Sequence, residues 1–305
     1  MQTPLILFLP LFLATTLFPF LNEPGETVLP SLKMTAGPRA QALGGAGVAA
    51  EGDGAGATLN PAGLQDIEED QIFLEHLSLY QNMKSEFISA LIRYPHFRLC
   101  ASLQYMDLGF GPITNSEGSD YSEENTFHAF DAAFMLTGSF EYHQTRIGIT
   151  LKALREEIWY YGSNGLAMDI GLIRRGLWDN HLSIGASLMN LGYATPFDKK
   201  RYPLTTLFRT GIAYEYELTD EVTLLGLSDL NLSNDGQFTL PLGLEAQWTY
   251  VRARAGYHLL HDTRTFSLGG GVEFSRFVLD YSYIRFGNDW NSNGTPHLFS
   301  LTIRI

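Results

Sequence analysis

The chain has 305 residues, of which 45% are hydrophobic and 13% aromatic, whereas only 17% are charged. Soluble domains carry roughly 25% charged residues, and a bundle of apolar membrane helices has a higher mean hydropathy than the −0.04 of this chain. The net charge of −13 argues against a nucleic-acid partner, because phosphate binding needs a basic surface. The longest basic run is only Lys199, Lys200 and Arg201.

Residues 1–22 are predicted to be a cleaved signal peptide. The stretch 4–21 is uncharged and rich in Leu and Phe, so its length alone would also suit a membrane anchor. Pro10 and Pro19 interrupt such a helix, however, and no basic stop-transfer cluster follows it. We therefore expect an exported protein without a helical anchor.

Residues 23–69 differ in composition from all that follows, since the stretch 35–63 is rich in Gly and Ala and poor in aromatic residues. It holds too few large apolar groups to order a core of its own. We predict that it packs against the periplasmic end of the next domain as a plug. Asn60 and Pro61 are expected to make a rigid turn there, because Asn bonds its own backbone in turns and Pro fixes φ.

From residue 70 to residue 305 apolar and polar residues alternate, which is the period of a β-strand. In one run, for example, Leu242 and Leu244 alternate with Gly243 and Glu245. We expect fourteen strands, at 71–81, 85–95, 97–108, 126–139, 144–156, 163–175, 180–191, 207–218, 221–232, 237–248, 249–260, 264–274, 276–287 and 296–305.

These runs favour an all-β fold, a transmembrane antiparallel β-barrel, over a soluble β-sandwich. Sandwich strands average about 5–6 residues, whereas a tilted strand needs about 9–11 to cross a bilayer. Short connections such as 94–96 alternate with the long ones at 109–125, 192–206 and 287–296, as in outer-membrane barrels. We therefore predict a barrel of about 14 strands with a small N-terminal plug, located in the bacterial outer membrane and surrounded by its lipid.

The polar faces of the predicted strands carry charges of both signs. They would line the inside of the barrel, either as ion pairs that stabilise a hydrated lumen or as a charged constriction for a polar solute. Arg209 and Asp229 belong to these faces, and the residues singled out as lumen charges are Glu245, Arg252, Arg254, Glu273 and Asp280.

Evidence for catalysis, a cofactor or a metal is weak. Residues 45–50 match the glycine spacing of a dinucleotide-binding loop, but no strand precedes them and no βαβ pattern follows. The eight histidines are scattered, and no nucleophile elbow is present. The single cysteine, Cys100, excludes an intrachain disulfide. We expect no enzyme, no cofactor and no metal.

The blocks 39–49, 52–53 and 60–64 resemble the N-terminal signature of the PorV/PorQ proteins, and the likeness continues through 165–172, 182–192, 252–257 and 268–272. PorV/PorQ proteins are fourteen-stranded relatives of the FadL fatty-acid channel. The resemblance implies a plugged barrel, and for some members a role in type IX protein secretion, with secreted proteins or secretion machinery as partners.

Two functions are compatible with the predicted barrel. One is a secretion-associated barrel that works through loop contacts with other proteins, and the other is a FadL-like channel for hydrophobic small molecules. A channel needs an apolar pocket inside the barrel, and the polar faces do not supply one. The sequence therefore favours the secretion-associated barrel.

Overall fold

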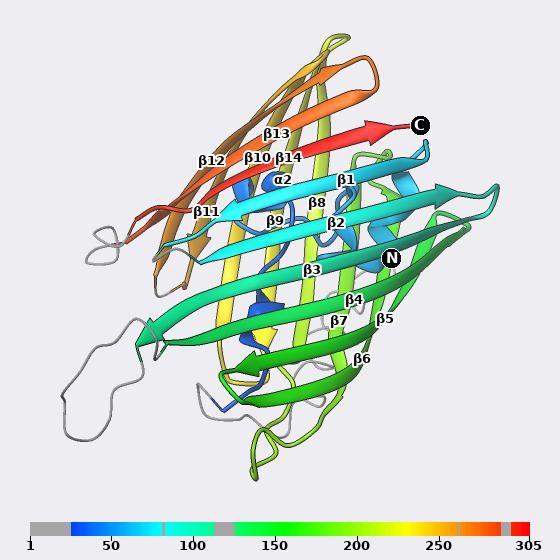
Figure 1. Cartoon of the computed structure of the whole chain (residues 1–305). Coiled ribbons are helices and arrows are strands. Elements are labelled where there is room, and N and C mark those ends of the chain that lie inside the picture. Colours follow the sequence, from blue (N-terminus) through cyan, green and yellow to red (C-terminus); the bar gives the residue numbers. More distant parts are fainter. Residues whose placement is uncertain (1–25, 81–82, 113–125, 262, 288–293) are drawn as a thin grey trace.

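The computed structural model describes residues 26–80, 83–112, 126–261, 263–287 and 294–305. The fourteen strands in this part of the chain pair antiparallel with their sequence neighbours, and β1 pairs with β14, so the sheet closes into a barrel (Figure 1). The predicted fold class is confirmed. The strands are β1 (Gln71–Ser78), β2 (Lys84–Arg93), β3 (Phe97–Pro112), β4 (Thr126–Tyr142), β5 (Thr145–Ile158), β6 (Tyr161–Leu177), β7 (Leu182–Ala194), β8 (Leu207–Thr219), β9 (Val222–Ser233), β10 (Phe238–Trp248), β11 (Val251–Leu259), β12 (Arg264–Phe274), β13 (Phe277–Phe286) and β14 (His297–Arg304).

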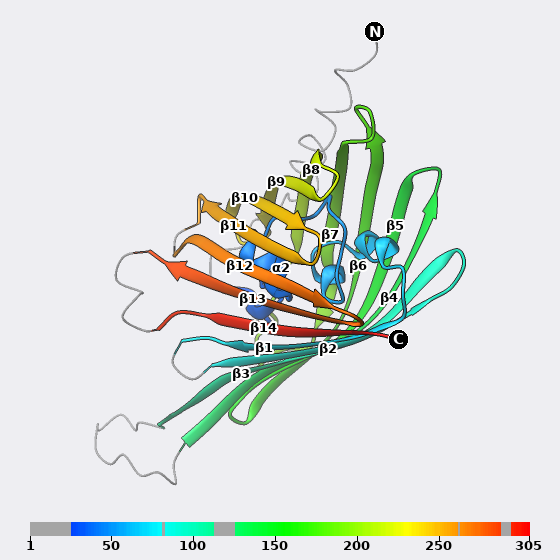
Figure 2. The ribbon, with the colours of Figure 1, turned by 90° about the horizontal axis from the view of Figure 1, so that it is seen from above.

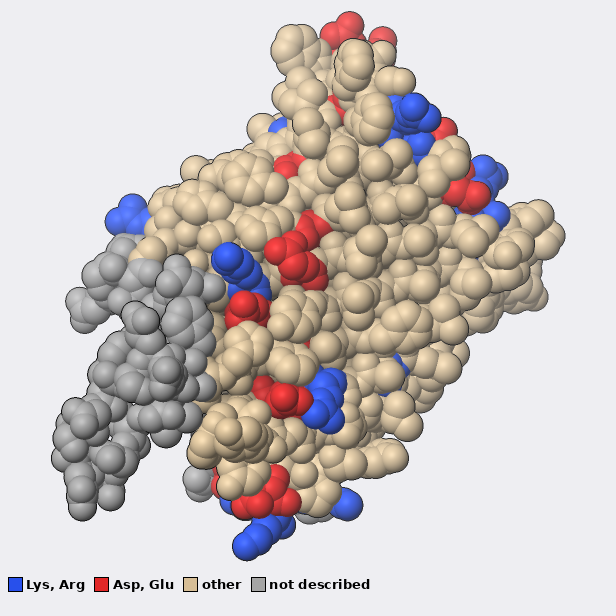
Figure 3. All heavy atoms as spheres, in the orientation of Figure 1, with Lys and Arg blue, Asp and Glu red and all other residues tan. Residues whose placement is uncertain are grey.

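Successive side chains in each strand point into and out of the barrel. On β10, Glu245 is 4% exposed whereas Leu244 is 55% exposed. Side chains without charge cover most of the strands on the outer face that Figure 3 presents. An apolar outer face and a polar inner face are what a barrel in a bilayer requires, because lipid-facing and lumen-facing residues alternate.

The two ends of the barrel differ. At one end, here called the turn end, β1 begins, β14 finishes and the connections are short, as at 143–144, 220–221 and 249–250. The opposite end, the loop end, carries the connections 113–125, 195–206 and 287–296, together with the two-residue turn 159–160. The expected difference between short connections at one end and long connections at the other is therefore present, but not every loop-end connection is long.

The wall of the barrel has uneven height. Strands β3 to β6 have 14 to 17 residues, whereas β1, β2 and β11 to β14 have 8 to 11. About 9–11 residues suffice for a tilted strand to cross a bilayer. At the loop end, the wall formed by the longer strands therefore extends beyond the membrane. The wall formed by the shorter strands, across the barrel, is lower at that end.

Residues 26–70, here called the inner segment, lie inside the ring of strands in both ribbon views (Figures 1 and 2). No helix in the described part of the chain is long and apolar enough to cross a bilayer. The predicted signal peptide, 1–22, lies outside the described residues. The short helices of the inner segment are η1 (Pro30–Lys33), α2 (Pro38–Ala42), η2 (Gly56–Thr58) and η3 (Pro61–Asp66).

Packing of the inner segment explains why β1 alternates poorly in the sequence. Phe73 and Leu77 point inward and are 1% and 3% exposed, while Leu74 points outward and is 37% exposed. Phe73 packs in a cluster with Leu29 and Ala55 of the inner segment. Both faces of β1 therefore carry large apolar side chains, one set against lipid and the other against the segment, although Gln71 and Glu75 also point inward.

Candidate functional site

The inner segment extends from the loop end of the lumen to the turn end. At the loop end Val28 forms a parallel bridge with Leu204, and the Leu29 amide donates to Glu156 Oε2 at 3.0 Å. At the turn end Asp66 pairs with Arg146 and Arg175. The segment therefore runs through the lumen from one end of the barrel to the other, and its role as a plug at the periplasmic end stays a prediction.

Inward-facing glycines of the wall make room for the segment. A Cβ atom on Gly148 would overlap the backbone at Pro61, and one on Gly185 would overlap the carbonyl of Val48. Gly256 is equally close to the Gly44 amide. These three wall glycines are therefore contact points with the segment, where any larger side chain would push the two apart.

Asn60 and Pro61 lie at one of these contacts. The Asn60 side chain accepts from the Ala62 amide at 3.0 Å and so caps η3, in which Pro61 is the first residue. Its Nδ2 donates to the carbonyls of Val48 at 2.7 Å and Leu172, on β6, at 3.1 Å. Besides making a turn, Asn60 thus links two parts of the segment to the wall.

Three of the five singled-out lumen charges form one buried network with the segment. Glu245 Oε1 lies 2.8 Å from Arg39 Nη2, and Glu245 Oε2 lies 2.5 Å from Arg254 Nε. Arg254 Nη1 in turn lies 2.5 Å from Asp280 Oδ1, two strands away. The glycine between them permits this contact, because a Cβ on Gly271 would overlap the Asp280 carboxylate. Arg39 is thereby held against β10 and β11.

The other two singled-out charges lie apart from this network, nearer the turn end. Arg252 Nη2 is 3.0 Å from Glu273 Oε2, and Arg304 pairs with the same carboxylate. The Glu273 side chain is 19% exposed, against 5% for Glu245. This second group links β11, β12 and β14 to one another, and it meets the inner segment only at its last residues, where Arg304 Nε lies 3.7 Å from Glu69 Oε2.

A cavity of about 370 Å³ opens at the loop end between the inner segment and the wall. This volume lies within the range of about 300–1,000 Å³ that is typical of small-molecule pockets. One side of the cavity is apolar, in part because the inner segment and the β1–β2 connection contribute methionines. The apolar side comprises Met34, Leu79, Met83, Met106 and Phe286.

The opposite side of the cavity is polar and comes from β8, β9 and β10. Arg209, 4% exposed, donates from Nη1 to Thr35 Oγ1 at 3.0 Å, and Asn231 Nδ2 donates to Thr239 Oγ1 at 3.3 Å. Arg209 Nε and Asn231 Oδ1 have no hydrogen-bond partner among the described residues. Since buried polar atoms are normally paired, this side could take the polar end of a bound molecule.

An ion pair attaches the segment beside the cavity. Lys33, from η1, pairs with Asp235 in the turn between β9 and β10. Burial by itself would raise the pKa of the Asp235 carboxyl, but the hydrogen bond and the charge of Lys33 outweigh burial and hold this pKa below its ordinary value. The pair therefore persists at neutral pH, and it would weaken only as the pH falls through the lowered pKa.

Sequence analysis missed the cavity because its lining comes from distant parts of the chain. Arg209 and Asp229 stood out only as members of polar faces, yet both bind the segment: Asp229 Oδ2 accepts from the amides of Gly47 at 2.7 Å and Val48 at 2.9 Å. Arg39 was part of a motif but not of the expected charge set. The sequence offered one signal of this contact: Arg39 is basic, and the predicted polar faces of the strands hold more acidic than basic residues.

No known protein family and no curated protein sequence matches the chain, but solved structures do. The toluene transporter TbuX of Ralstonia pickettii superposes with a TM-score of 0.63 at 14% identity, covering 88% of this chain and 98% of its own. The toluene transporter TodX of Pseudomonas putida gives 0.60 at 11%, covering 88% and 96%. A FadL homologue of Pseudomonas aeruginosa gives 0.53 at 10%, covering 88% and 98%. The chain thus has the fold of the FadL-like outer-membrane β-barrels.

Proposed function

We propose that the protein is an outer-membrane channel for small hydrophobic or amphipathic molecules, which it binds first in the loop-end cavity. The observation that carries the proposal is the cavity itself, with an apolar side that holds Met34, Met106 and Phe286 and a polar side that holds Arg209 and Asn231. Such a lining suits a molecule with an apolar body and one hydrogen-bonding end.

In this proposal the inner segment is a plug that closes the lumen below the cavity. Support comes from its contacts with the wall at Glu245, Asp229 and Leu172, which lie between the cavity and the turn end. A bound molecule would touch the segment directly, since Met34 and Thr35 line the cavity. Displacement of the segment would then open a path toward the turn end, which we propose faces the periplasm.

The alternative inferred from the PorV/PorQ resemblance was support of protein secretion. The similar solved structures named above are two toluene transporters and a FadL homologue, which favour the channel. A protein-secretion role would also leave the cavity without a purpose. We therefore replace the secretion hypothesis by the channel.

Tryptophan substitutions at two adjacent residues of β10 test whether molecules pass through the cavity. Thr239 lines the cavity, so Thr239→Trp should fill it, whereas Leu240 follows on the outer, lipid-facing side of β10. In cells that lack other porins for the probe, the unaltered chain should speed uptake of a monoaromatic hydrocarbon such as toluene. We expect Thr239→Trp to abolish that gain and Leu240→Trp to retain it. If cells with the unaltered chain and cells with either variant all take up the probe no faster than cells without the protein, the proposal is refuted.

A further inference from the structure

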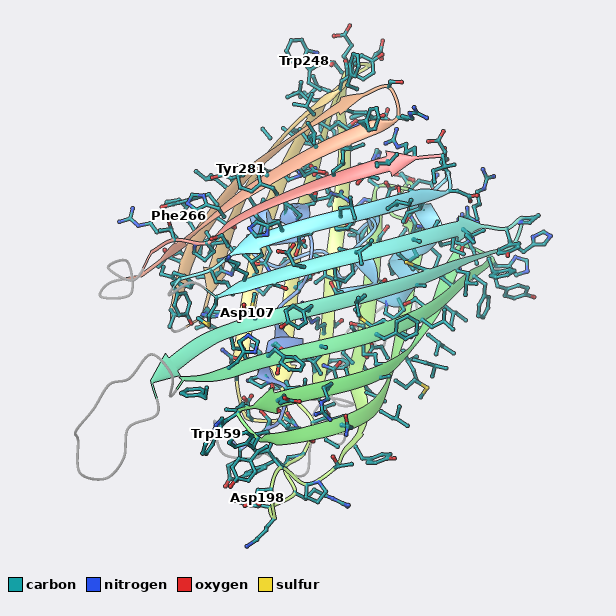
Figure 4. All side chains as sticks on the ribbon, viewed as in Figure 1. Asp107, Trp159, Asp198, Trp248, Phe266 and Tyr281 are labelled. Atoms are coloured by element: carbon teal, nitrogen blue, oxygen red, sulfur yellow. The ribbon has the colours of Figure 1, made fainter. Side chains whose placement is uncertain are left out.

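An exposed patch of aromatic and basic side chains lies on the high wall at the loop end. It is formed by the β5–β6 turn and the β7–β8 connection, and we call it the rim patch. Figure 4 labels Trp159 and Asp198, one from each of these segments, at the end of the barrel opposite Trp248. The rim patch comprises Trp159, Tyr160, Tyr161, Phe197, Lys199, Lys200 and Arg201.

The two segments are joined into one surface. The Thr195 amide donates to the Asn164 carbonyl at 2.8 Å, and the rings of Tyr161 and Phe197 have centroids 6.4 Å apart. Phe197 and Lys200 exchange backbone hydrogen bonds of 3.0 and 3.3 Å, which close a tight turn around Asp198. The basic run is therefore presented beside the aromatic rings.

The aromatic part of the rim patch is open to the surroundings. Tyr160 is 83% exposed, Tyr161 44% and Trp159 40%. The rings of Trp159 and Tyr160 lie with centroids 4.5 Å apart. Large exposed rings that pack against one another offer flat faces to a partner, and Trp and Tyr are enriched where a membrane protein meets the lipid headgroups.

The basic part consists of three exposed cations, Lys199, Lys200 and Arg201, next to one exposed acid, Asp198. Lys200 lies 3.6 Å from Glu26 and over the ring of Tyr202 at 4.8 Å. Lys199 and Arg201 make no ion pair with any residue that the structure describes. In a chain with a net charge of −13, such a cluster of exposed cations suits an anionic partner.

The height of the rim patch identifies that partner as lipid. Outward charged pairs, such as His128 with Asp107 at 3.1 Å and Arg155 with Glu157 at 2.5 Å, mark where the apolar outer face ends on β3 to β5. Trp159 follows Arg155 by four residues, roughly 10 Å of height for a tilted strand. The patch therefore lies at the level of the headgroups of the outer leaflet.

We propose that the rim patch binds the phosphorylated sugar headgroup of an outer-leaflet glycolipid. Lys199 and Arg201 would contact the phosphate, because charge-assisted hydrogen bonds from Arg and Lys to phosphate are strong. The rings of Trp159 and Tyr160 would pack against the faces of the sugars. The inference rests on the placement of the barrel in the outer membrane and on the proposed orientation, with the loop end outward, and not on the proposed transport through the channel.

Native mass spectrometry of the full-length protein in detergent would test the proposal, with diphosphorylated lipid A as the probe and with dephosphorylated lipid A and phosphatidylcholine as comparisons. We expect retention of the phosphorylated probe above both others. Each surface Lys or Arg contributes about 1 kcal/mol of attraction to an anionic lipid, so Lys199→Gln with Arg201→Gln should weaken binding roughly thirtyfold. Heat-modifiable migration in gels verifies that each variant is folded.

Lys84→Gln with Arg276→Gln is the matched control, because it removes one exposed Lys and one exposed Arg that make no ion pair with a described residue. The control should bind the probe as the unaltered chain does. Equal weakening in both double variants, or none in the rim-patch variant, would overturn the proposal. The proposal would also be overturned if inorganic phosphate displaced lipid A completely, or if a protein rather than lipid A stayed bound to the chain.

Discussion

At the scale of single residues, inward charges serve chiefly to hold the inner segment. Glu245 is shared by Arg39 of the segment and Arg254 of the wall, and Asp229 accepts from two amides of the segment. The sequence suggested instead that these charges pair with one another in a hydrated lumen or form a charged constriction. The structure changes this expectation because the carboxylate has two buried cationic partners.

Glu245→Gln is therefore predicted to destabilise the protein strongly. Removing one partner of a buried ion pair costs up to about 3–5 kcal/mol; here Arg39 loses its ion-pair partner, whereas Arg254 keeps Asp280. Glu273→Gln is the matched control: its side chain is 19% exposed, and partly hydrated pairs contribute about 0–1 kcal/mol. Urea unfolding of the two variants, reconstituted in detergent, measures the difference. Equal losses would mean that Arg39 is not held by Glu245.

At the scale of elements, the fold consists of a hydrogen-bonded wall and a segment that depends on it. The wall closes through β1 and β14 and needs no contact from the segment to complete its backbone pairing. The segment has only short helices, of 3 to 6 residues, and packs through small residues such as Ala42, Ala46 and Ala62. It is therefore the element that can leave the lumen without opening the barrel.

Removal of the segment should leave a barrel that conducts ions. A variant in which residues 35–58 are replaced by a Gly/Ser linker of equal length loses the contacts at Glu245, Asp229 and Ser267. We expect this variant to assemble, to show heat-modifiable migration and to have a higher single-channel conductance in planar bilayers than the intact chain. If an assembled variant conducts no more than the intact chain, the segment does not occlude the lumen.

At the scale of the whole molecule, the outer face must match the bilayer and the inner face must match the segment and water. Leu244 on β10 is 55% exposed on the outer face. Thr223, on the neighbouring strand, lines a hollow of about 70 Å³ near the turn end, together with Glu215 and Glu245. The same substitution therefore meets lipid at position 244 and a polar hollow inside the barrel at position 223.

Leu244→Arg should impair assembly far more than Thr223→Arg. A cation at the lipid-facing midplane costs about 2–4 kcal/mol, whereas an arginine at position 223 stays inside the barrel, in a hollow lined by charged side chains of both signs. The folded fraction after refolding into lipid vesicles, read from heat-modifiable migration, gives the comparison. Assembly to the same extent in both variants would place Leu244 away from lipid and would contradict the facing of β10.

The period-2 pattern made the barrel predictable from sequence, because alternation of faces is a local property of each strand. All fourteen runs match strands, and the largest boundary difference is at the end of β3, expected at 108 and observed at Pro112. The pattern failed to stand out at β1, where Phe73 and Leu77 meet the inner segment and Leu74 meets lipid. There both faces carry large apolar residues, for different reasons.

Only the tertiary structure decided where the inner segment runs and where a ligand could bind. Met34, Met83, Met106 and Phe286 meet in one cavity although they are far apart in the chain, and no local pattern records that meeting. The pairing of Arg39 with Glu245 spans 206 residues. A sequence determines such contacts only through the closure of the barrel, since closure brings distant strands around one lumen and fixes what the segment can touch.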